Sequence, residues 1–594
     1  MVVTKGWTSE VFRFLRGIAQ GDNYSSIIFL IVFQPLISFL ESRKEALGYQ
    51  LGDSKVITKP FADDFETITN NLKQHQKLMD TTQEKAGTMG LTYKPSKCRT
   101  LSIQSGRVSS AQFHLKDKQG NLVNVSTLED DPSKFLGSVL THRNTPADHA
   151  HFLNDKLEVK LANLDKAEVR AEHKVAVYSR YVLPSMRFHL TVHNIHQTHL
   201  DELDGIAKRF LKKWLEFPTR GVSDLSIFHP AILGIQRPSQ VYMEGHVGAH
   251  LQSPLFGDSV TKEALKSRMA REGAWVKKSS TIMECEEVFQ QLELEQHLPL
   301  MEDNPQYCTT MRVEMRKHKQ EAKKIVQDKV LEASQEQARE LVLQGEFARL
   351  LEEQECNTDW QSMIHCLPRG LLAFAARATS NSLPSHDNLA RRKKLVSPKC
   401  PLCDKVPLCD KLSNCQTSLQ QGRYDYRHDS ILSYLYSIVR KARREKMEVY
   451  CDLDGARVNG GTLPPDILVT ASRPDLVLVD RSTTPCSVEL VELTVPWDSG
   501  AEGARVRKEL RYATLVEDII EMGLKCKHTT LEIGARGLIN QRNKTTITWL
   551  CSLARERRIQ RVTSTLSKLA LLGSYCIWVA RRSKDWSSGS LLKP

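Results

Sequence analysis

The pattern of apolar and polar residues changes between helical and strand periodicity along the first 140 residues. Residues 27–40 are almost continuously apolar, and residues 70–89 carry apolar positions at helical spacing, so we expect a helix in each segment. Residues 56–61 and 65–68 are short segments on either side of a tight turn, which predicts two strands. This part of the chain is therefore predicted to be mixed α/β.

The middle of the chain is predicted to be helical. Four leucines recur at intervals of three or four residues: Leu153, Leu157, Leu161 and Leu164. Residues 199–214 form a second helical pattern, and its last two turns combine basic and aromatic residues: Lys208, Arg209, Phe210, Lys212, Lys213 and Trp214. Residues 261–395 are rich in Glu, Gln, Lys and Arg. A helical pattern over residues 310–353, without a sustained heptad seam, predicts a helical connector.

Beyond Arg427 a helix rich in basic residues leads into a predicted α/β domain. Its first strand covers residues 476–479, and a turn that contains Thr484 and Pro485 joins it to a second strand at residues 487–495. A helix then carries five basic or aromatic residues: Arg505, Arg507, Lys508, Arg511 and Tyr512.

Carboxylates stand at one end of this predicted hairpin. Asp475 directly precedes the first strand, and Glu489 and Glu492 lie on the second. Facing side chains of adjacent strands approach to about 5 Å, so Asp475 and one glutamate can share a metal ion. Because side chains alternate along a strand, the two glutamates point to opposite faces, and only one of them can do so. The alternative is a turn aspartate and a solvated glutamate.

The composition narrows the class of protein. At roughly 150 residues per domain, a chain of 594 residues is long enough for three or four domains. A hydrophobic content of 40% excludes global disorder. The net charge of +13, from 83 Lys and Arg against 70 Asp and Glu, suits a polyanionic partner but does not identify one.

Cysteine usage and the apolar segments indicate the compartment. The fourteen cysteines form no disulfide framework of a small secreted domain, which favours a reducing interior, nucleus or cytoplasm. No signal peptide is visible. The apolar run at residues 27–40 contains Gln34 and Pro35 and is too short to span a bilayer, so we expect a buried helix and no membrane partner.

Four cysteines lie at metal-ligand spacing: Cys400, Cys403, Cys409 and Cys415. A Cys-Pro-Leu-Cys turn presents two thiolates on one side, and two further ligands complete a tetrahedral Zn²⁺ site with a structural role. The alternative is a decayed site with free thiols.

A second carboxylate pair, Asp63 and Asp64, lies in the turn between the two N-terminal strands, where it can hold a divalent cation. It stands in an ordered series with residues 16–22 (RGIAQGD), 90–98 (GLTYKPSKC) and 135–137 (FLG). This series resembles the later palm motifs of reverse transcriptases. The resemblance implies Asp63 and Asp64 as catalytic Mg²⁺ or Mn²⁺ ligands, with Gln20, Gly21 and Lys97 in contact with the substrate. The alternative is an accidental acidic turn.

The resemblance also implies what is missing. Reverse transcriptases take a further metal ligand from an aspartate on an earlier palm strand, and residues 1–14 contain no aspartate. We therefore expect a partial palm without fingers, and no polymerase activity from this chain. The basic and aromatic helix at 199–214 stands where a thumb grips the duplex; the alternative is a helical bundle with a solvated basic face.

The cysteine cluster resembles the zinc knuckle that precedes the endonuclease of certain non-LTR retrotransposons. The match extends through residues 383–384 (LP), 388–389 (NL), 422–424 (GRY) and 427–429 (RHD). The family usually has a histidine where this chain has Asp410, so the third Zn²⁺ ligand is either Cys409 or Asp410.

The C-terminal carboxylates resemble the restriction-endonuclease-like domain of the same elements. On that match Asp475 and Glu492 bind Mg²⁺ or Mn²⁺, Lys508 stabilises or activates the attacking water, and Tyr512 contacts the substrate. The wider nuclease superfamily places its lysine where this chain has Thr494. Residues 532–537 (EIGARG) extend the match.

These observations predict a multidomain α+β protein. Its expected parts are a partial reverse transcriptase palm (1–140), a helical thumb (141–260), a helical connector (261–395), a zinc knuckle (396–430) and an α/β restriction-endonuclease-like domain (431–594). The expected partners are DNA and RNA. The leading interpretation is a retrotransposon reverse transcriptase/endonuclease; the alternatives are a non-catalytic nucleic-acid-binding protein and a poorly folding fragment. The sequence leaves the DNA target, the template RNA and any upstream coding sequence open.

Overall fold

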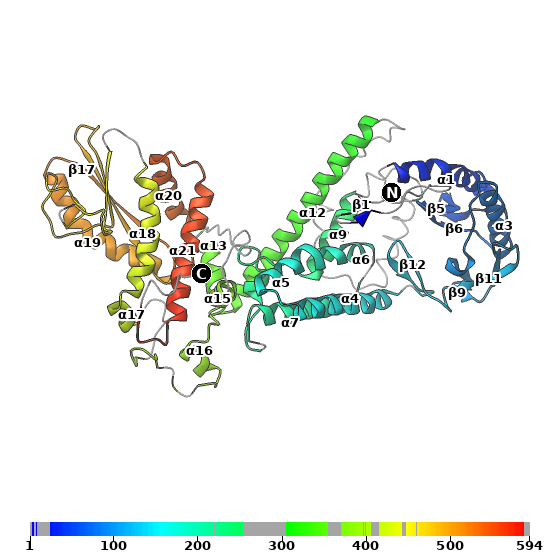
Figure 1. Ribbon diagram of the computed structural model, residues 1–594, viewed down its shortest axis with the longest axis horizontal. Coiled ribbons are helices and arrows are strands. Elements are labelled where there is room, and N and C mark those ends of the chain that lie inside the picture. Colours follow the sequence, from blue (N-terminus) through cyan, green and yellow to red (C-terminus); the bar gives the residue numbers. More distant parts are fainter. Residues whose placement is uncertain are drawn as a thin grey trace. The chain divides into compact units, whose positions relative to one another are not determined.

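The chain divides into two compact units, each assembled from separate stretches of sequence (Figure 1). In this computed structural model, the described residues are 3–4, 7–8, 24–143, 145–193, 195–218, 220–252, 260, 305–354, 370–395, 397, 399–405, 415–441, 447–458 and 460–586. The N-terminal unit consists of Met1–Asp155, Arg187–Glu202 and Tyr242–Lys323, and the C-terminal unit of Lys156–Met186, Leu203–Val241 and Lys324–Pro594.

Some expectations fall outside the described residues. These are the segment with Gln20 and Gly21, the candidate ligands Cys409 and Asp410, and residues 261–304 of the expected connector. The domain boundaries near residues 140, 260, 395 and 430 stay predictions. The mixed α/β multidomain class is the one the structure shows.

The N-terminal unit is mixed α/β, as predicted. Its sheets are small: one has the order β10-β11-β7, and the pairs β1-β2, β3-β4, β5-β6, β8-β9 and β12-β13 are two-stranded. The elements are β1 (Val3–Thr4), β2 (Trp7–Thr8), α1 (Ser25–Glu41), α2 (Lys44–Leu47), β3 (Tyr49–Leu51), β4 (Ser54–Val56), β5 (Thr58–Phe61), β6 (Asp64–Thr67), α3 (Leu72–Thr88), η1 (Pro95–Lys97), β7 (Arg99–Thr100), β8 (Ser102–Gln104), β9 (Arg107–Ser109), β10 (Phe113–Lys116), β11 (Leu122–Thr127), β12 (Ser133–Phe135) and β13 (Ser138–Leu140).

Helix α1 confirms the helix predicted at residues 27–40, but the prediction that it is buried was wrong. Phe33, Leu36 and Leu40 lie on its buried stripe, whereas Leu30 and Ile31 are 52% and 67% exposed. The sequence is apolar all round, and only one stripe of a helix can face the neighbouring α3 and β5. A continuous run of apolar residues therefore did not distinguish a fully buried helix from a helix that is buried on one face only.

The middle of the chain is helical, as predicted. Leu153, Leu157 and Leu161 are fully buried along α4. The elements are α4 (Pro146–Lys166), α5 (Ala171–Val177), η2 (Tyr178–Val182), η3 (Pro184–Met186), α6 (Arg187–Val192), α7 (Gln197–Trp214), α8 (Leu225–Phe228), α9 (Pro238–Gln252), α12 (Pro305–Glu340), α13 (Glu346–Glu353), α15 (Leu371–Thr379) and α16 (His386–Arg391).

The single long helix expected over residues 310–353 is broken into α12 and α13. Gly345 lies at the break, and a Cβ there would stand 2.0 Å from the carbonyl oxygen of Ala338. The guanidinium of Arg349 donates to the carbonyls of Ala338, Leu341 and Val342, which satisfies acceptors that the end of α12 leaves unpaired. Gly345 therefore permits the break, and Arg349 caps the end of α12. Neither effect can be predicted from hydrophobic periodicity.

The predicted C-terminal α/β domain is present as a four-stranded sheet of order β14-β15-β16-β17. The first three strands are antiparallel, and β17 is parallel to β16. The elements are α17 (Gln416–Gln420), α18 (Arg423–Val439), β14 (Met447–Cys451), β15 (Leu476–Asp480), β16 (Ser487–Thr494), η6 (Asp498–Gly500), α19 (Ala501–Glu521), β17 (Lys525–Glu532), α20 (Gln541–Leu553) and α21 (Ile559–Val579).

Helices cover both faces of this sheet (Figure 1). On one face Val491 and Leu493 of β16 pack in a core with residues of α18, α20 and α21. On the other face Val488 and Leu490 pack against Tyr512, Leu515 and Ile519 of α19. Because both faces are covered, β15 is a nearly continuous apolar run, and β16 carries apolar residues on both of its faces.

Helix α21 is long and apolar enough to cross a membrane by length and composition. However, 61% of its apolar window is buried inside the protein, where it packs on α18 and α20. Core packing therefore accounts for its composition.

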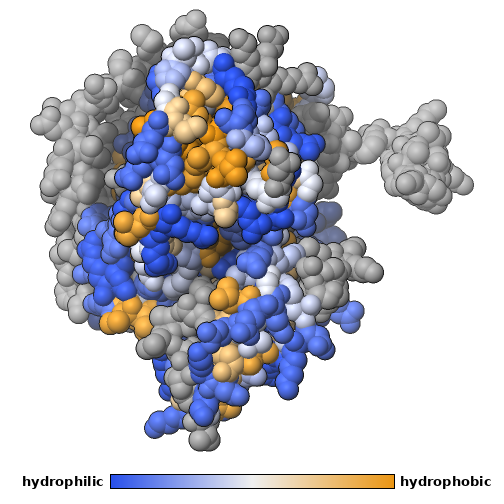
Figure 2. Space-filling view, turned by 90° about the vertical axis from the view of Figure 1, so that its left-hand side faces the viewer, coloured by the Kyte–Doolittle hydropathy of each residue, from blue (hydrophilic) through white to orange (hydrophobic). Residues whose placement is uncertain are grey.

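The surface over α19 mixes apolar and charged residues. Figure 2 views the structure from the side where α19 and β17 lie in Figure 1, and shows hydrophobic residues gathered between hydrophilic ones. The exposed apolar side chains of α19 include Val506, Leu510 and Ile520, and the exposed basic ones are Arg507 and Arg511.

A group of buried histidines makes the stability of the N-terminal unit sensitive to pH. The rings of His149 and His193 stack with centroids 3.6 Å apart, and the ring of His189 stacks on His193 with centroids 6.3 Å apart. Burial, and then the neighbouring His149 and His189, lower the pKa of His193 from 6.5 to about 4. The neutral form is therefore the one that the fold accommodates.

We expect the N-terminal unit to lose stability as the pH falls from 6.5 towards 4. Above pH 6.5 the His193 imidazole is neutral in the folded and in the unfolded chain, so it costs no stability there. Below that pH the unfolded chain binds a proton that the folded chain resists, and the free energy of unfolding falls, by roughly 3 kcal/mol once the pH is below 4. Hydrogen exchange of α6, corrected for intrinsic rates, measures the loss. His193→Gln should flatten the pH dependence, whereas His151→Gln, at an exposed histidine, should not. An unchanged pH dependence in His193→Gln would contradict the assignment.

Candidate functional site

The main candidate site lies where β15 begins beside the end of β16. The register pairs Leu476 with Val491, so the preceding residue, Asp475, stands opposite Glu492. The backbone N–H of Asp475 donates to Glu492 Oε2 at 3.1 Å, and the N–H of Leu493 donates to Asp475 Oδ2 at 2.8 Å. Both carboxylates are buried, with exposed fractions of 8% and 1%. The juxtaposition predicted from strand pairing is therefore present.

Helix α19 adds a positively charged side chain, Lys508, to this pair of carboxylates. Ala504, Tyr512, Leu515 and Ile519 form the buried face of the helix, and Lys508 lies on the same face. Its ammonium forms an ion pair with Glu492 Oε1. Asp475, Glu492 and Lys508 thus lie together, although they come from three different parts of the fold. Lys508 is two turns into α19, which begins after the turn that follows β16.

The electrostatics of the pair favour a bound cation. Burial, and then the charge of Asp475, raise the pKa of Glu492 to about 7, while Lys508 opposes this shift. Two close carboxylates in a site of low dielectric repel each other, and a cation between them relieves this repulsion. Carboxylate oxygens are the hard ligands that Mg²⁺ and Mn²⁺ prefer. The residues present therefore fit a Mg²⁺ or Mn²⁺ ion held by Asp475 and Glu492.

The alternation of Glu489 and Glu492 is confirmed. Glu489 shares the face of Val491 and Leu493, which pack towards α18, α20 and α21, and it stands opposite Lys527 of β17. Burial raises the pKa of Glu489. It therefore lies on the far side of the sheet from Glu492.

Tyr512 is buried beneath the site. Its hydroxyl donates to the carbonyl of Arg473 at 3.1 Å, which anchors the segment that leads into Asp475. This is a structural contact, and the expected contact with substrate stays a prediction. Thr494, at the position of the superfamily's lysine, lies at the end of β16.

His428 belongs to this site and was missed as a functional residue. Its Nε2 lies 3.2 Å from Asp475 Oδ2, and its Nδ1 lies 3.0 Å from Asp429 Oδ1. Burial lowers its pKa, but the two aspartates outweigh burial and raise that pKa to about 10. The only signal in the sequence was the Arg-His-Asp series at 427–429, which carried no role of its own.

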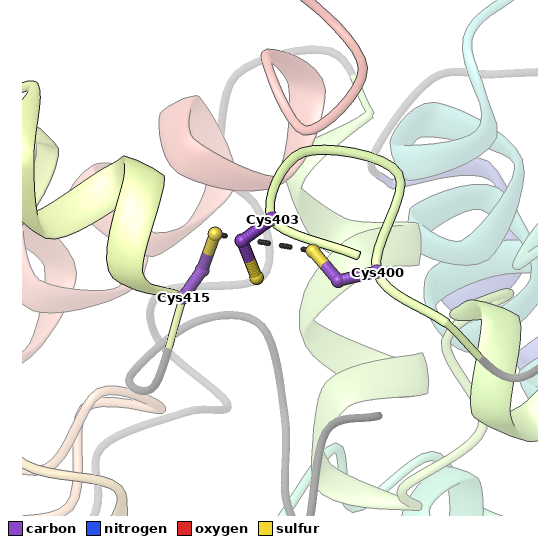
Figure 3. Close-up of side chains that lie close together, drawn as sticks. All are labelled: Cys400, Cys403 and Cys415. Atoms are coloured by element: carbon purple, nitrogen blue, oxygen red, sulfur yellow. Dashed lines mark hydrogen bonds between the residues drawn. The ribbon is translucent and has the colours of Figure 1, made fainter. Parts of the chain in front are cut away.

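The candidate zinc site gathers three of the four predicted cysteines (Figure 3). The sulfur atoms of Cys400, Cys403 and Cys415 all lie within 4.8 Å of one another, and Cys400 and Cys415 are buried. Among the described residues this is the one group of three or more potential ligands close enough to hold a metal ion. Three soft thiols fit Zn²⁺, with the fourth ligand left open between Cys409 and Asp410.

The surroundings of the cysteines favour thiolates unequally. Burial raises the pKa of Cys400. For Cys403, burial acts in the same direction, but hydrogen bonds from the Lys405 backbone and from the neighbouring thiols outweigh it, and the pKa is lowered. The backbone N–H of Cys415 donates to the hydroxyl of Tyr424 at 2.9 Å, which ties the cluster to the first turn of α18.

The N-terminal carboxylates lie on a hairpin, as predicted. Phe61 pairs with Asp64, so Ala62 and Asp63 form a two-residue turn, and Ala62 has a positive φ of 54°. Phe65 anchors this hairpin, because its ring lies 5.8 Å from Phe33. Both aspartates are exposed, and Lys97 is exposed at the end of η1. Their catalytic and substrate-binding roles stay predictions.

The basic end of α7 makes contacts within its own unit, and the choice between a thumb and a helical bundle with a solvated basic face stays a prediction. Phe210 and Trp214 are buried, and the indole of Trp214 donates to Asp165 at 2.9 Å. The basic side chains are occupied within the C-terminal unit: Lys208 pairs with Asp224, Arg209 with Glu158 and Lys213 with Asp165, and Lys212 donates to the carbonyl of Val222. These partners come from distant positions that a helical pattern cannot show.

A second residue missed by sequence reasoning is Arg536, in the segment that follows β17. Its Nε donates to Asp498 Oδ2 at 2.8 Å, and both side chains are buried. Its guanidinium lies 4.1 Å from the centroid of Trp497 and 4.9 Å from that of Phe347 in α13. Arg536 therefore joins the end of the sheet to a connector helix.

Comparisons with known proteins name a class for part of the chain. Residues 2–140 match the family model described as reverse transcriptase (RNA-dependent DNA polymerase). This match contains the Asp63-Asp64 hairpin.

More particular similarity is to polyproteins of R2 retrotransposable elements. The Retrovirus-related Pol polyprotein from type-2 retrotransposable element R2DM of Drosophila melanogaster is 27% identical over 223 residues, which are 36% of this chain and 20% of that protein. The type-1 R2 polyproteins of Bradysia coprophila and Popillia japonica are 22% and 26% identical, over 35% and 36% of this chain and 24% and 34% of their own length. The chain thus spans a fifth to a third of the relatives it matches. These similarities support a reverse transcriptase of the R2 type for the parts of the chain that they cover.

Proposed function

We propose that this chain is a retrotransposon reverse transcriptase/endonuclease whose C-terminal unit cleaves DNA with a divalent metal ion. The observation that carries the proposal is the meeting of Asp475, Glu492 and Lys508 at one end of the sheet. In the leading interpretation the nick supplies a 3′ end that primes reverse transcription of RNA. The expectation that this chain lacks polymerase activity stays a prediction, as does its location in the nucleus or cytoplasm.

The residues of the site have distinct tasks in this mechanism. Asp475 and Glu492 would hold the cation, and Mg²⁺ or Mn²⁺ would polarise the scissile phosphate and lower the pKa of the attacking water. Lys508 offsets the negative charge that develops on the phosphate. The exposed Arg507 and Arg511, on the flank of the same helix, favour the approach of a DNA backbone.

A nicking assay tests the proposal. The full chain is incubated with supercoiled plasmid in Mg²⁺ or Mn²⁺, and conversion to open circles is followed on a gel. We expect nicking that EDTA suppresses. DNA binding without nicking in either metal would favour the non-catalytic nucleic-acid-binding protein.

The cysteine cluster is proposed to be a structural zinc knuckle. The purified chain should carry about one equivalent of Zn²⁺, because four protein ligands hold the ion without an open position. Metal analysis should show that Cys400→Ser and Cys415→Ser release it. Comparing Cys409→Ser with Asp410→Ala identifies the remaining ligand, since only loss of the true ligand releases metal. Metal-free protein with an unchanged melting curve would refute the knuckle.

A further inference from the structure

The first two turns of α18 lie between the cysteine cluster and the paired carboxylates. Tyr424 accepts the hydrogen bond from Cys415, and one turn later His428 reaches Asp475. Arginines fix this part of the helix from both sides. Arg423 donates to the carbonyls of Ala580 and Ser583, and Arg427 to the hydroxyl of Ser574 and the carbonyl of Val495.

These contacts fix the orientation of the His428 ring. Nε2 lies within hydrogen-bond distance of two acceptors, Asp475 Oδ2 at 3.2 Å and the carbonyl of Leu493 at 3.3 Å. An atom that faces only acceptors must carry the hydrogen, so Nε2 donates. Nδ1 faces the carboxylate of Asp429 at 3.0 Å and holds the ring from the other side.

The two oxygens of Asp475 are consequently unequal. Oδ2 accepts from the N–H of Leu493 and from His428, so two donors fix its position. Across the described parts of the chain no donor contacts Oδ1. A carboxylate held in this way presents one oxygen to an incoming cation and cannot rotate to offer the other.

We propose that His428 is a positioning residue, which holds Asp475 Oδ2 so that Oδ1 is the oxygen available to the divalent cation. This inference rests on the proposed function of the carboxylate pair. His428 does not touch the scissile phosphate in this account; it acts through Asp475. Groups that orient metal ligands in this way typically contribute roughly 10–100-fold to metal affinity or activity.

Three substitutions separate positioning from simple packing. The amide nitrogen of glutamine can occupy the place of Nε2, that of asparagine can occupy only the place of Nδ1, and leucine supplies no donor. Mn²⁺ affinity is measured on the zinc-loaded full chain by the electron paramagnetic resonance of free Mn²⁺, and nicking and melting are followed in parallel. We expect His428→Leu and His428→Asn to weaken Mn²⁺ binding roughly 10–100-fold, while His428→Gln retains most of the affinity.

The outcomes discriminate between the inference and the proposed function. If the wild-type chain nicks DNA and binds Mn²⁺ but His428→Leu equals it in affinity, the positioning role is wrong and the endonuclease stands. If His428→Leu does not fold, His428→Gln and His428→Asn are compared instead. Equal Mn²⁺ affinities of these two variants would overturn the inference. A wild-type chain that neither binds Mn²⁺ nor nicks overturns both.

Discussion

Asp475→Asn and Glu492→Gln should each lower the nicking rate about 10³-fold, since losing one ligand of the cation removes several kcal/mol of transition-state stabilisation. Both substitutions keep the shape of a buried side chain, so the fold should persist. Initial rates of plasmid nicking at saturating Mg²⁺ and Mn²⁺ measure the effect. Binding to the same DNA, followed by fluorescence anisotropy, should change little, because it rests on distributed basic residues and weakens with salt.

Glu489→Gln is the matched control for these variants. It removes a partly buried carboxylate from the same strand, but on the opposite face of the sheet from Asp475. Its nicking rate should remain close to that of the wild type. Equal losses in the Glu489 and Glu492 variants, or full activity of Asp475→Asn, would contradict the assignment of the site.

Arg536→Met should destabilise the C-terminal unit by about 3–5 kcal/mol, because it leaves Asp498 buried without its partner. Urea unfolding, with hydrogen exchange of α13 and β17, measures the loss. The paired substitution Arg536→Met with Asp498→Leu should recover part of it, since the buried Asp498 carboxylate is then absent as well.

An exposed ion pair provides the comparison. Arg481 contacts Glu448 at 2.9 Å, and both side chains are more than a third exposed. Arg481→Met should cost no more than about 1 kcal/mol. If Arg536→Met costs no more than Arg481→Met, the buried ion pair of Arg536 with Asp498 does not stabilise the C-terminal unit as expected.

Local patterns predicted the parts of the site that depend on strand geometry. The hairpin at Asp63 and Asp64 and the opposite orientations of Glu489 and Glu492 were predicted from strand geometry. Strand pairing also predicted that Asp475 faces one glutamate, and the resemblance to endonucleases identified that residue as Glu492. The helix that carries Lys508 was also predicted. The resemblance to endonucleases placed Lys508 in the same site as Glu492, but their ion pair was not predicted.

Tertiary packing decided what the sequence could not show. The contact of His428 with Asp475 spans 47 residues and depends on how α18 packs on the sheet. The same holds for the acidic partners of α7, and for Arg349, which caps the end of α12 from beyond the break. Hydrophobic periodicity describes one helix or strand at a time. It therefore does not predict which face of a helix packs against another element, or which charged side chain forms an ion pair.

The arginine contacts of α18 have a consequence for folding during synthesis. Asp475 and Glu492 are close in sequence and can pair soon after they leave the ribosome, whereas Arg423 waits for carbonyls that are 157 and 160 residues later. Contacts of such high sequence separation form late and slowly. The Arg423 guanidinium should therefore stay without these partners until Ala580 and Ser583 have emerged, although His428 and Arg427 can already reach Asp475 and Val495. A nascent chain would then form its carboxylate pair before all the contacts that fix the start of α18 are in place.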